Sequence, residues 1–481
     1  MSEENKPKAE AEEGETDPMN PRNVHQNNGS TTVEAPSLPL RKLNPLLYWT
    51  TVLYLVGVPN FLHFDDTGRT HGNGLFNLTS ISLIAIGFVS AYILLVVVLL
   101  SRQFLLCRKV SVAASLWILL LLQLVLSSIL QPPSRLTPYS VTDLFVSFYR
   151  MWEWILGFAL ILALYTRTPI NRGTELIVEL IGRLSWIWIA ITWIILPIMP
   201  SQVFGGAGEG EVSTGHPQLG GQLISPSYLA TLSIAGFFYA LFFFPRGLKR
   251  VLGCTVAFVT IVLARTRFEQ ASFLLLLFLY AVVFSGKIIL RVATIISASV
   301  IAALGLLFRN VILTYIQRGQ KASSLTTLND RTFVWKASIE AIKQRPILGY
   351  GFVSGAKNAI RDHWIHANWI PPHAHNELIE AMLSGGILAL ILILCIYGRA
   401  LWVAWRTAYL GPRRIILLFL MILFLIRSLG GSNITFIYTR VGALFLLTFI
   451  GILADQTGLS RRKHDPVSVD SHHLSHHEVG A

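Results

Sequence analysis

Titratable side chains gather at the start of one apolar segment of the chain. His373 and His375 stand two residues apart, and Glu377 and Glu380 follow with the spacing of one helical turn. Because an imidazole titrates near neutral pH, a histidine here could take a proton from an incoming nucleophile, and a neighbouring carboxylate could orient the ring. The cluster is the strongest general-base candidate in the sequence. The alternatives are a polar helix cap and a site in which both histidines hold one metal ion.

Basic residues are concentrated on the same part of the chain. The segment 309–376 contains nine basic residues and three acidic ones, and Arg265 and Arg267 separate two short apolar segments. An arginine at membrane depth costs about 2.5–3.5 kcal/mol. A guanidinium binds phosphate oxygens through two parallel hydrogen bonds. This pattern favours a phosphate or pyrophosphate ligand for Arg265 and Arg331, whereas Lys336, Lys343, Lys357 and Arg361 fit lipid headgroups.

The sequence around Arg331 predicts the element that positions it. Asp330 is a suitable N-cap, and apolar residues recur at helical spacing over 331–342. This predicts an amphipathic helix lying on the membrane surface, with Arg331 in its first turn. Pro346 prevents the helix from continuing, and the glycines on either side of Tyr350 predict a tight turn.

A second positioning element precedes the apolar segment that begins at residue 377. Pro371 and Pro372 favour an extended chain at this point. His375 and Asn376 are therefore predicted to lie at the outer mouth of a membrane span, at the depth of the lipid headgroups.

The composition identifies the kind of protein that carries these residues. Of the 481 residues, 53% are hydrophobic and 14% are charged, whereas soluble proteins have about 25% charged residues. This excludes a string of soluble domains and predicts an all-α polytopic membrane protein with about twelve transmembrane helices. The formal net charge of +13 fits cytoplasmic loops and gives no reason to expect nucleic acid as a partner. The predicted spans are 45–64, 75–100, 110–130, 143–165, 177–199, 226–244, 248–264, 268–286, 288–308, 377–400, 413–431 and 436–454.

The charges of the short loops predict the orientation of these spans. Short loops rich in lysine and arginine alternate along the chain with loops poor in them, and the basic loops are expected in the cytoplasm. This places both termini in the cytoplasm and the segment 309–376 on the outer face. The seventh and eighth spans are short, and a single helical hairpin that dips into the membrane is the alternative for them. The predicted organisation is a disordered tail (1–42), nine spans (43–308), a long, partly helical outer loop (309–376), three spans (377–455) and a His-rich tail (456–481).

The motifs of this loop form a recognisable set. Arg331-Thr332-x-x-Trp335 is followed by Pro346-x-x-Gly349-Tyr350-Gly351-Phe352, and the loop ends in His375-Asn376, ahead of Met382-Leu383-x-Gly385-Gly386-Ile387 in the next helix. The set resembles the O-antigen ligase family, which also includes O-antigen polymerases and exopolysaccharide polymerases. The resemblance extends over roughly residues 250–400 and does not separate ligase from polymerase.

The resemblance implies a membrane glycosyltransferase of the C type in the bacterial inner membrane, with the long loop and the active site facing the periplasm. The donor would be a glycan on undecaprenyl pyrophosphate, and the acceptor would be a sugar hydroxyl of the lipid A core or of a growing polysaccharide. Arg331 and either Arg265 or Arg267 match the family arginines that bind pyrophosphate, and His375 matches the histidine proposed as base. Ala264 stands where a serine often precedes the span arginine.

From the resemblance and the residues together we expect inverting, metal-independent transfer, with no cofactor. Glu377 and Asn376 are expected to assist His375, with His373, Glu380 and Tyr350 in secondary roles. Membrane lipids are further expected partners. The alternative from another class is a transporter of lipid-linked glycans. A transporter should carry charge along a central path through both halves, whereas here the unusual charge lies at one face, which favours an enzyme.

Overall fold

The structure is a computed structural model of the chain, and every residue it describes belongs to the compact unit Leu43–Ala481. The described residues are 111–131, ten positions between 144 and 158, 173–205, 217–310 except 222, 331–365, 371, 373–435 and 440–462. The first two predicted spans, the N-terminal tail (1–42) and the C-terminal tail beyond residue 462 therefore lie outside the described residues. So do Asp330, Pro372 and most of the fourth predicted span.

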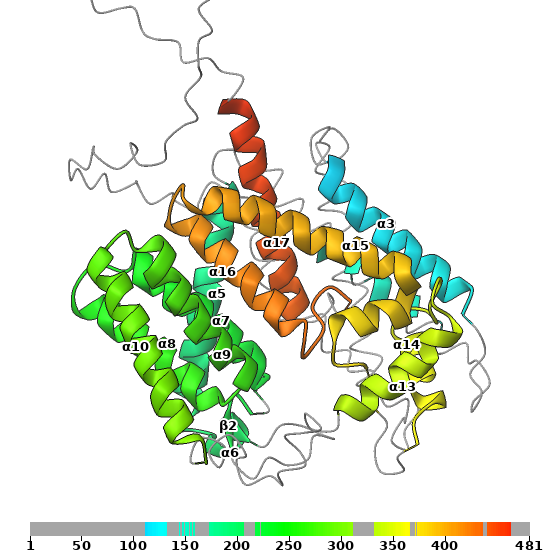
Figure 1. Ribbon diagram of the computed structural model, residues 1–481, viewed down its shortest axis with the longest axis horizontal. Helices are drawn as coiled ribbons and strands as arrows, with labels where there is room; N and C mark the ends of the chain where they lie inside the picture. The colour runs from blue at the N-terminus through cyan, green and yellow to red at the C-terminus, as the bar shows by residue number, and fades with distance from the viewer. Residues whose placement is uncertain are drawn as a thin grey trace, which may run out of the picture. The chain divides into compact units, whose positions relative to one another are not determined.

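The described part is helical, apart from one short pair of strands (Figure 1). The strands β1 (Phe204–Gly205) and β2 (Gln218–Leu219) pair in antiparallel fashion. The helices before the loop are α3 (Ser111–Ile129), α5 (Gly173–Ile195), α6 (Pro200–Val203), α7 (Pro226–Phe243), α8 (Leu248–Ala264), α9 (Arg267–Leu279), its π-helical continuation η6 (Tyr280–Phe284) and α10 (Ile288–Leu307). After these come α13 (Arg331–Gln344), α14 (Ser354–Asp362), α15 (Glu377–Ala408), α16 (Pro412–Arg427) and α17 (Arg440–Arg462).

Five helical segments of the described part are long and apolar enough to cross a membrane. They are Gly173–Ile195, Pro226–Phe243, Arg267–Phe284, Ile288–Leu307 and Glu377–Ala408. They correspond to the predicted fifth, sixth, eighth, ninth and tenth spans, which confirms an all-α membrane protein. Helix α8 has the bounds predicted for the seventh span, and α16 falls where the eleventh span was predicted but ends earlier, at Arg427. The total of twelve spans, their orientation and the domain boundaries remain predictions.

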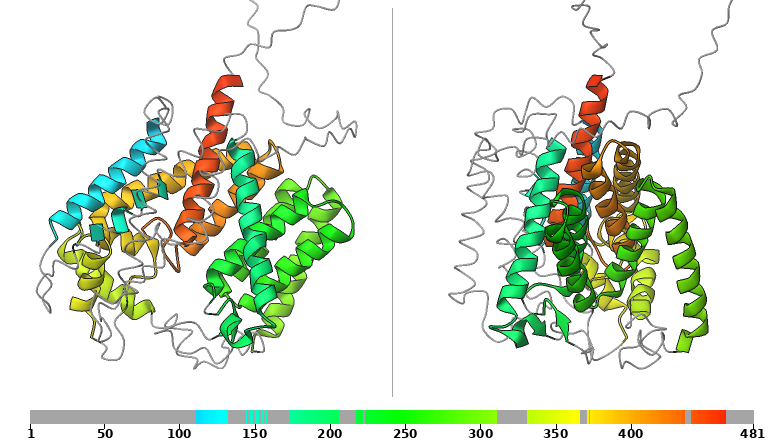
Figure 2. Two further views of the ribbon diagram at one scale, coloured as in Figure 1. Left: turned by 180° about the vertical axis from the view of Figure 1, so that it is seen from behind. Right: turned by 90° about the vertical axis from the view of Figure 1, so that its left-hand side faces the viewer.

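Small residues let the membrane helices approach each other closely. The backbone of Gly182 on α5 lies against the Tyr239 ring on α7, so that an added Cβ would sit 2.3 Å from a ring carbon. A Cβ added at Gly451 on α17 would lie 2.9 Å from Ile177 of α5 and 3.2 Å from Leu417 of α16. Helices α5, α16 and α17 therefore pack side by side (Figures 1 and 2). Close packing of this kind stabilises helices in lipid, where no hydrophobic effect drives their association.

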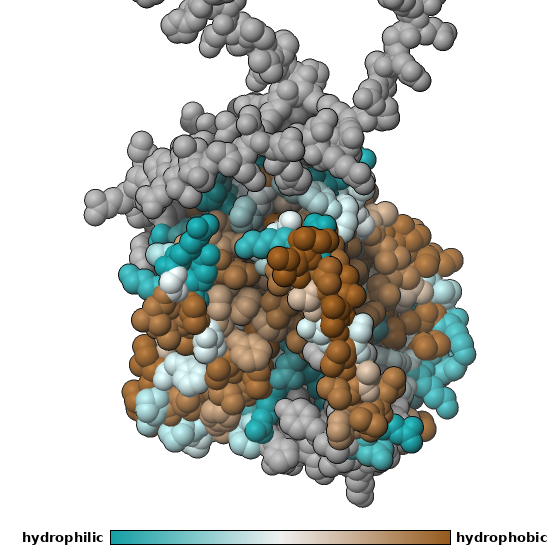
Figure 3. Space-filling model, turned by 60° about the vertical axis from the view of Figure 1, so that its left-hand side comes forward, coloured by the Kyte–Doolittle hydropathy of each residue, from teal (hydrophilic) through white to brown (hydrophobic). Residues whose placement is uncertain are grey.

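The outer surfaces of the helices are apolar. Ile289 on α10 is 81% exposed, and leucines at the far end of the same helix are also exposed. Figure 3 shows large hydrophobic areas over the helices on one face of the molecule. Exposed apolar side chains over whole helices are unfavourable in water and typical of a surface that faces lipid tails.

In its described residues, the loop between α10 and α15 contains two short helices, α13 and α14, that pack on α15 (Figure 1). As predicted, α13 begins at Arg331 and ends at Gln344, two residues before Pro346. Its buried residues Val334 and Ala341 join a small core with α14 and with Leu383 of α15. Protein therefore covers this face of α13, and the position of the helix at the membrane surface stays a prediction. The sequence reasoning did not identify α14.

The helical backbone of α15 is interrupted at Gly386. The turn that follows α13, at Gly349–Gly351, packs against this break. Gly386 has φ 69° and ψ −163°, a conformation that only glycine adopts readily. The break leaves the carbonyls of Leu383 and Ser384 free to accept hydrogen bonds from the N–H groups of Tyr350 and Gly351, at 2.6 and 3.2 Å. Ser127 on α3 donates to the Ser384 carbonyl as well, at 2.7 Å. The predicted tight turn at Gly349–Gly351 is thus fixed to the helix that begins at the site.

Replacing Gly386 with alanine is expected to destabilise the protein strongly. An alanine Cβ would lie 2.0 Å from the carbonyl oxygen of Ile347, in a backbone conformation that alone costs about 1–3 kcal/mol for a residue with a side chain. Thermal unfolding of purified protein in detergent measures the loss. Gly398→Ala on the same helix is the matched control, because no atom lies within 4 Å of its added Cβ. Equal melting temperatures for the two variants would contradict this account.

Candidate functional site

The segment that carries the two histidines has a defined, strained backbone. His375 has φ 52°, which is uncommon for a residue with a side chain. Its N–H donates to Nδ1 of His373 at 3.1 Å, and the two rings lie 3.9 Å apart between centroids. Between them, the N–H of Ala374 donates to the buried carboxylate of Glu380 at 2.8 Å. Glu380 therefore fixes the backbone that presents both imidazoles. Strain of this kind is often found at functional sites.

Both imidazoles are held in the neutral form at neutral pH. Burial, together with the nearby Arg331 guanidinium, lowers the pKa of His373 to about 4. Burial, His373 and Arg331 together place the pKa of His375 well below its ordinary value of 6.5. A neutral imidazole can accept a proton, so His375 is ready to act as a base without first losing one.

The free energy of unfolding is expected to decrease as the pH falls from 6.5 to 4. In this interval the unfolded chain protonates His373, whereas the folded protein, with a pKa of about 4, does not. This contribution to stability is therefore complete above pH 6.5 and is lost towards pH 4. Melting temperatures of wild type and His373→Gln, measured in detergent between pH 7.5 and 4.5, test it. The variant should show a shallower pH dependence, and equal slopes would mean that other groups titrate.

Glu377 and Asn376 organise the start of α15. Asn376 is the N-cap, and its Oδ1 accepts from the N–H groups of Leu378 and Ile379 at 3.0 and 3.2 Å. The Glu377 carboxylate is fully buried and accepts from the backbone N–H groups of Asn433, Ile434 and Thr435. The described contacts of these two residues are structural, and the assisting roles predicted for them remain predictions.

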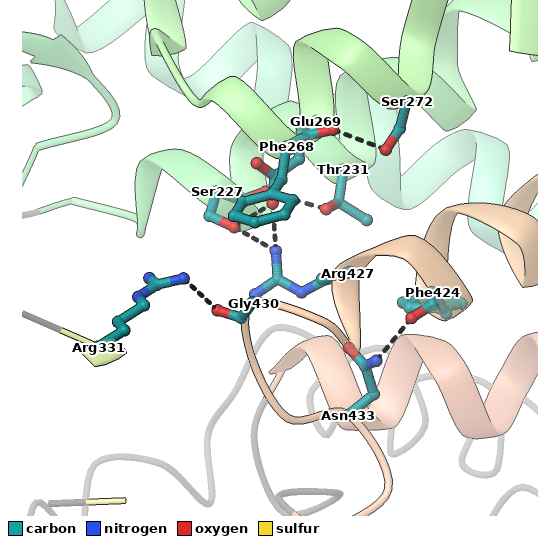
Figure 4. A network of polar contacts seen from close by, with 10 residues as sticks. All are labelled: Ser227, Thr231, Phe268, Glu269, Ser272, Arg331, Phe424, Arg427, Gly430 and Asn433. Carbon is teal, nitrogen blue, oxygen red and sulfur yellow. Dashed lines mark hydrogen bonds and ion pairs between the residues drawn. The ribbon is translucent and has the colours of Figure 1, made fainter. Parts of the chain in front are cut away.

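The turn between α16 and α17, residues 428–435, connects this segment to the predicted phosphate-binding arginine. The N–H of Glu377 donates to the Ser428 carbonyl at 2.9 Å, and Nδ2 of Asn376 donates to the Leu429 carbonyl at 3.3 Å. Arg331, the first residue of α13, donates from Nη1 to the Gly430 carbonyl at 2.8 Å (Figure 4). The segment that carries the histidines, residues 373–377, is called the base segment below. The base segment and Arg331 are therefore bound to the same short turn.

The structure distinguishes the two arginines between α8 and α9. Arg265 is the C-cap of α8 with φ 54°, and it donates to the carbonyl of Pro217 beside β2. Arg267 is the first residue of α9. The next residue, Phe268, has its ring against Gly430, to which Arg331 is bound. The helix end that carries Arg267 thus lies beside the 428–435 turn, which favours Arg267 over Arg265 as the second cation of the site.

Sequence reasoning missed a buried ion pair at this turn. Nη1 of Arg427, at the end of α16, lies 2.5 Å from Oε1 of Glu269 on α9, and the two side chains are only 16% and 4% exposed. Ser227 on α7 accepts from Arg427 and donates to Glu269 (Figure 4). The available signal was a basic and an acidic residue inside two predicted spans, because charges within membrane segments usually pair with one another.

Tyr350 lies beneath α13 and away from the turn. Its hydroxyl donates to the Ala341 carbonyl at 2.9 Å, and its backbone is bound to Leu383. These contacts support a structural role.

Within the described ranges, no group of three or more His, Cys, Asp or Glu residues is arranged to hold a metal ion. Cys254 and Cys395 are free thiols.

These observations define a helical membrane protein with a polar, arginine-containing site at the start of α15. Residues 252–394 match the model of a protein family described as O-antigen ligase, so this part of the chain is similar to that family. This confirms the resemblance based on the loop motifs. Arg265, Arg267, Arg331 and His375 all lie within the matched residues, whereas Arg427 lies outside them.

Two curated proteins are similar to short stretches of the chain. "Putative polysaccharide ligase" of Rickettsia felis is 36% identical over 72 residues, which are 14% of this chain and 18% of that protein. "Putative polysaccharide ligase RP358" of Rickettsia prowazekii is 39% identical over 74 residues, with the same shares. The chain thus matches less than a fifth of the length of either relative, and the activity of the whole protein is a matter for proposal.

Proposed function

We propose that this protein is a glycosyltransferase of the bacterial inner membrane that moves a glycan from undecaprenyl pyrophosphate to a sugar hydroxyl at the periplasmic face. We propose a polysaccharide ligase, with the lipid A core as acceptor. The names of the two relatives favour ligase over polymerase. The observation that carries the proposal is that Asn376, which follows His375, and Arg331 are hydrogen-bonded to one short turn. Phe268, which follows Arg267 on α9, packs against the same turn.

The chemistry follows from the charges of such a reaction. The leaving group is a pyrophosphate, and negative charge grows on it as the glycosidic bond breaks. Arg331 and Arg267 would bind this charge, and one preorganised donor of this kind is typically worth about 3–4 kcal/mol in the transition state. The neutral His375 would take the proton of the attacking hydroxyl as the new bond forms. The expected stereochemistry is inversion, because the hydroxyl attacks opposite the leaving group.

The arginines would stabilise the pyrophosphate without a metal ion in this mechanism. Transfer by purified protein should therefore be unaffected by a strong chelator. Loss of transfer on chelation and its recovery with a divalent cation would show that this part of the proposal is wrong, while leaving the glycosyltransferase assignment intact.

A gel of surface glycans and of the lipid-linked pool tests the proposed function. A strain that lacks the gene is compared with the same strain rescued by wild type. Long glycan that remains on the lipid carrier, together with bare core, is the expected defect of a missing ligase. Core capped by a single repeat unit, or loss of long secreted polymer, would instead identify a polymerase. Lipid-linked glycan accumulating on the cytoplasmic face would indicate a transporter and contradict the proposal.

A further inference from the structure

The 428–435 turn contains none of the residues predicted for catalysis, yet three of its neighbours are attached to it. The start of α15 binds it through Asn376 and Glu377, and α13 binds it through Arg331. The third attachment is Arg427, the residue immediately before the turn, which pairs with Glu269 on α9. The relative placement of the base segment, Arg331 and the start of α9 therefore depends on where this turn is held.

We propose that Arg427 and Glu269 are a positioning pair for the transfer reaction. The pair fixes the 428–435 turn to α9, so that the Gly430 carbonyl holds the Arg331 guanidinium towards the donor pyrophosphate. This inference rests on the proposed function, because it assigns the pair to the same site. It adds two residues that the loop motifs do not contain.

The geometry favours positioning over direct substrate binding by Arg427. Its Nη1 is used by Glu269 at 2.5 Å and by Ser227, so the carboxylate already neutralises its charge. The hydroxyl of Ser227 also donates to Glu269, and the three groups come from α16, α9 and α7. A charge pair that is buried and bonded on both sides fixes the relative position of the helices that carry it.

The packing at Gly430 supports the same conclusion. An added Cβ at Gly430 would lie 2.7 Å from the Phe268 ring and 3.0 Å from Nη1 of Arg331. Phe268 precedes Glu269 on α9, so ring packing and ion pair come from adjacent residues of one helix turn. A small movement of α9 against α16 would therefore be transmitted to the carbonyl that binds Arg331.

A double-mutant cycle between Glu269 and Arg331 tests the proposal. Glu269→Gln keeps the size of the side chain and removes its charge, and it should lower transfer by about 10–10²-fold, as expected for a misplaced group. Arg331→Ala should lower it by about 10²–10³-fold. If the pair acts through Arg331, the double variant should be no less active than Arg331→Ala alone. Multiplication of the two losses, or wild-type activity of Glu269→Gln, would overturn the proposal.

Matched variants separate positioning from loss of fold. Glu340→Gln removes the acid of an exposed pair with Lys343 on α13, with side chains 49% and 63% exposed, and it should leave transfer unchanged. Melting temperatures in detergent identify any variant that fails to fold. If Glu269→Gln does not fold, Glu269→Asp, which keeps the charge, replaces it in the cycle. A double variant no less active than Arg331→Ala again supports the proposal, and multiplying losses or wild-type activity of the single variant again overturn it. An inactive wild type would refute the proposed function, whereas an active wild type with multiplying losses would refute the positioning pair alone.

Discussion

Replacing His375 with alanine is expected to lower glycan transfer by about 10²–10⁴-fold, the usual contribution of a general base. The imidazole is unprotonated at neutral pH and available to accept this proton, because burial, His373 and Arg331 lower its pKa well below 6.5. The measurement is the rate of transfer from lipid-linked glycan by purified protein, supported by rescue of the deletion strain. Transfer should fall without a comparable loss of affinity for the donor.

Two further variants make the His375 result specific. His375→Asn tolerates the positive φ of this position better than alanine does, so equal losses in both variants would assign the effect to the missing base and not to the backbone. His363→Ala is the control on the same loop, where the ring contacts Gln344 at 2.9 Å, and it should retain activity. Full rescue by His375→Ala at normal abundance would refute the assignment of the base.

Replacing Arg331 with lysine is expected to leave most of the defect of Arg331→Ala in place, a loss of about 10²–10³-fold in transfer. Lysine keeps the charge, but its ammonium lacks the planar guanidinium fork that donates to the Gly430 carbonyl and that would, in the proposed reaction, match phosphate oxygens. The loss should appear in kcat measured with the pyrophosphate-linked donor, because charge on the leaving group is greatest in the transition state.

The control for Arg331 comes from the same helix. Lys343→Met removes an exposed cation near the end of α13, whose ion pair with Glu340 contributes little in water. Its transfer rate should match that of wild type. Near-wild-type activity of Arg331→Lys would mean that charge alone is sufficient, and it would contradict a bidentate role. A loss confined to KM would indicate that Arg331 contributes to ground-state binding only.

Local sequence patterns predicted much of the fold. Apolar segments of suitable length located five helices that can span a membrane, because the bilayer sets their length and composition. Helical spacing and Pro346 predicted α13 within a few residues, and the two glycines around Tyr350 predicted its turn. The family resemblance also depended on local motifs, and the match over residues 252–394 confirms it.

Contacts between distant segments could not be predicted from one sequence. The spacing of Glu377 and Glu380 predicted carboxylates beside the histidines, but the structure uses Glu377 to bind the N–H groups of 433–435 and Glu380 to bind that of Ala374. Nothing in the local sequence of 428–435 indicates that its N–H groups donate to Glu377 or that its carbonyls accept from Asn376 and Arg331, since backbone groups carry no residue-specific signal.

The sequence by itself determined that the chain is a helical membrane protein and which residues could bind pyrophosphate and accept a proton. Residue type and periodicity are local properties, and they are sufficient for those conclusions. The tertiary structure decided that Arg331 and the base segment share one turn, that Phe268, next to Arg267, packs against Gly430 in that turn, and that Arg427 and Glu269 pair beside it. These features depend on the packing of helices that are distant in the chain: Arg331 and Gly430 are 99 positions apart, and Arg427 and Glu269 are 158 apart.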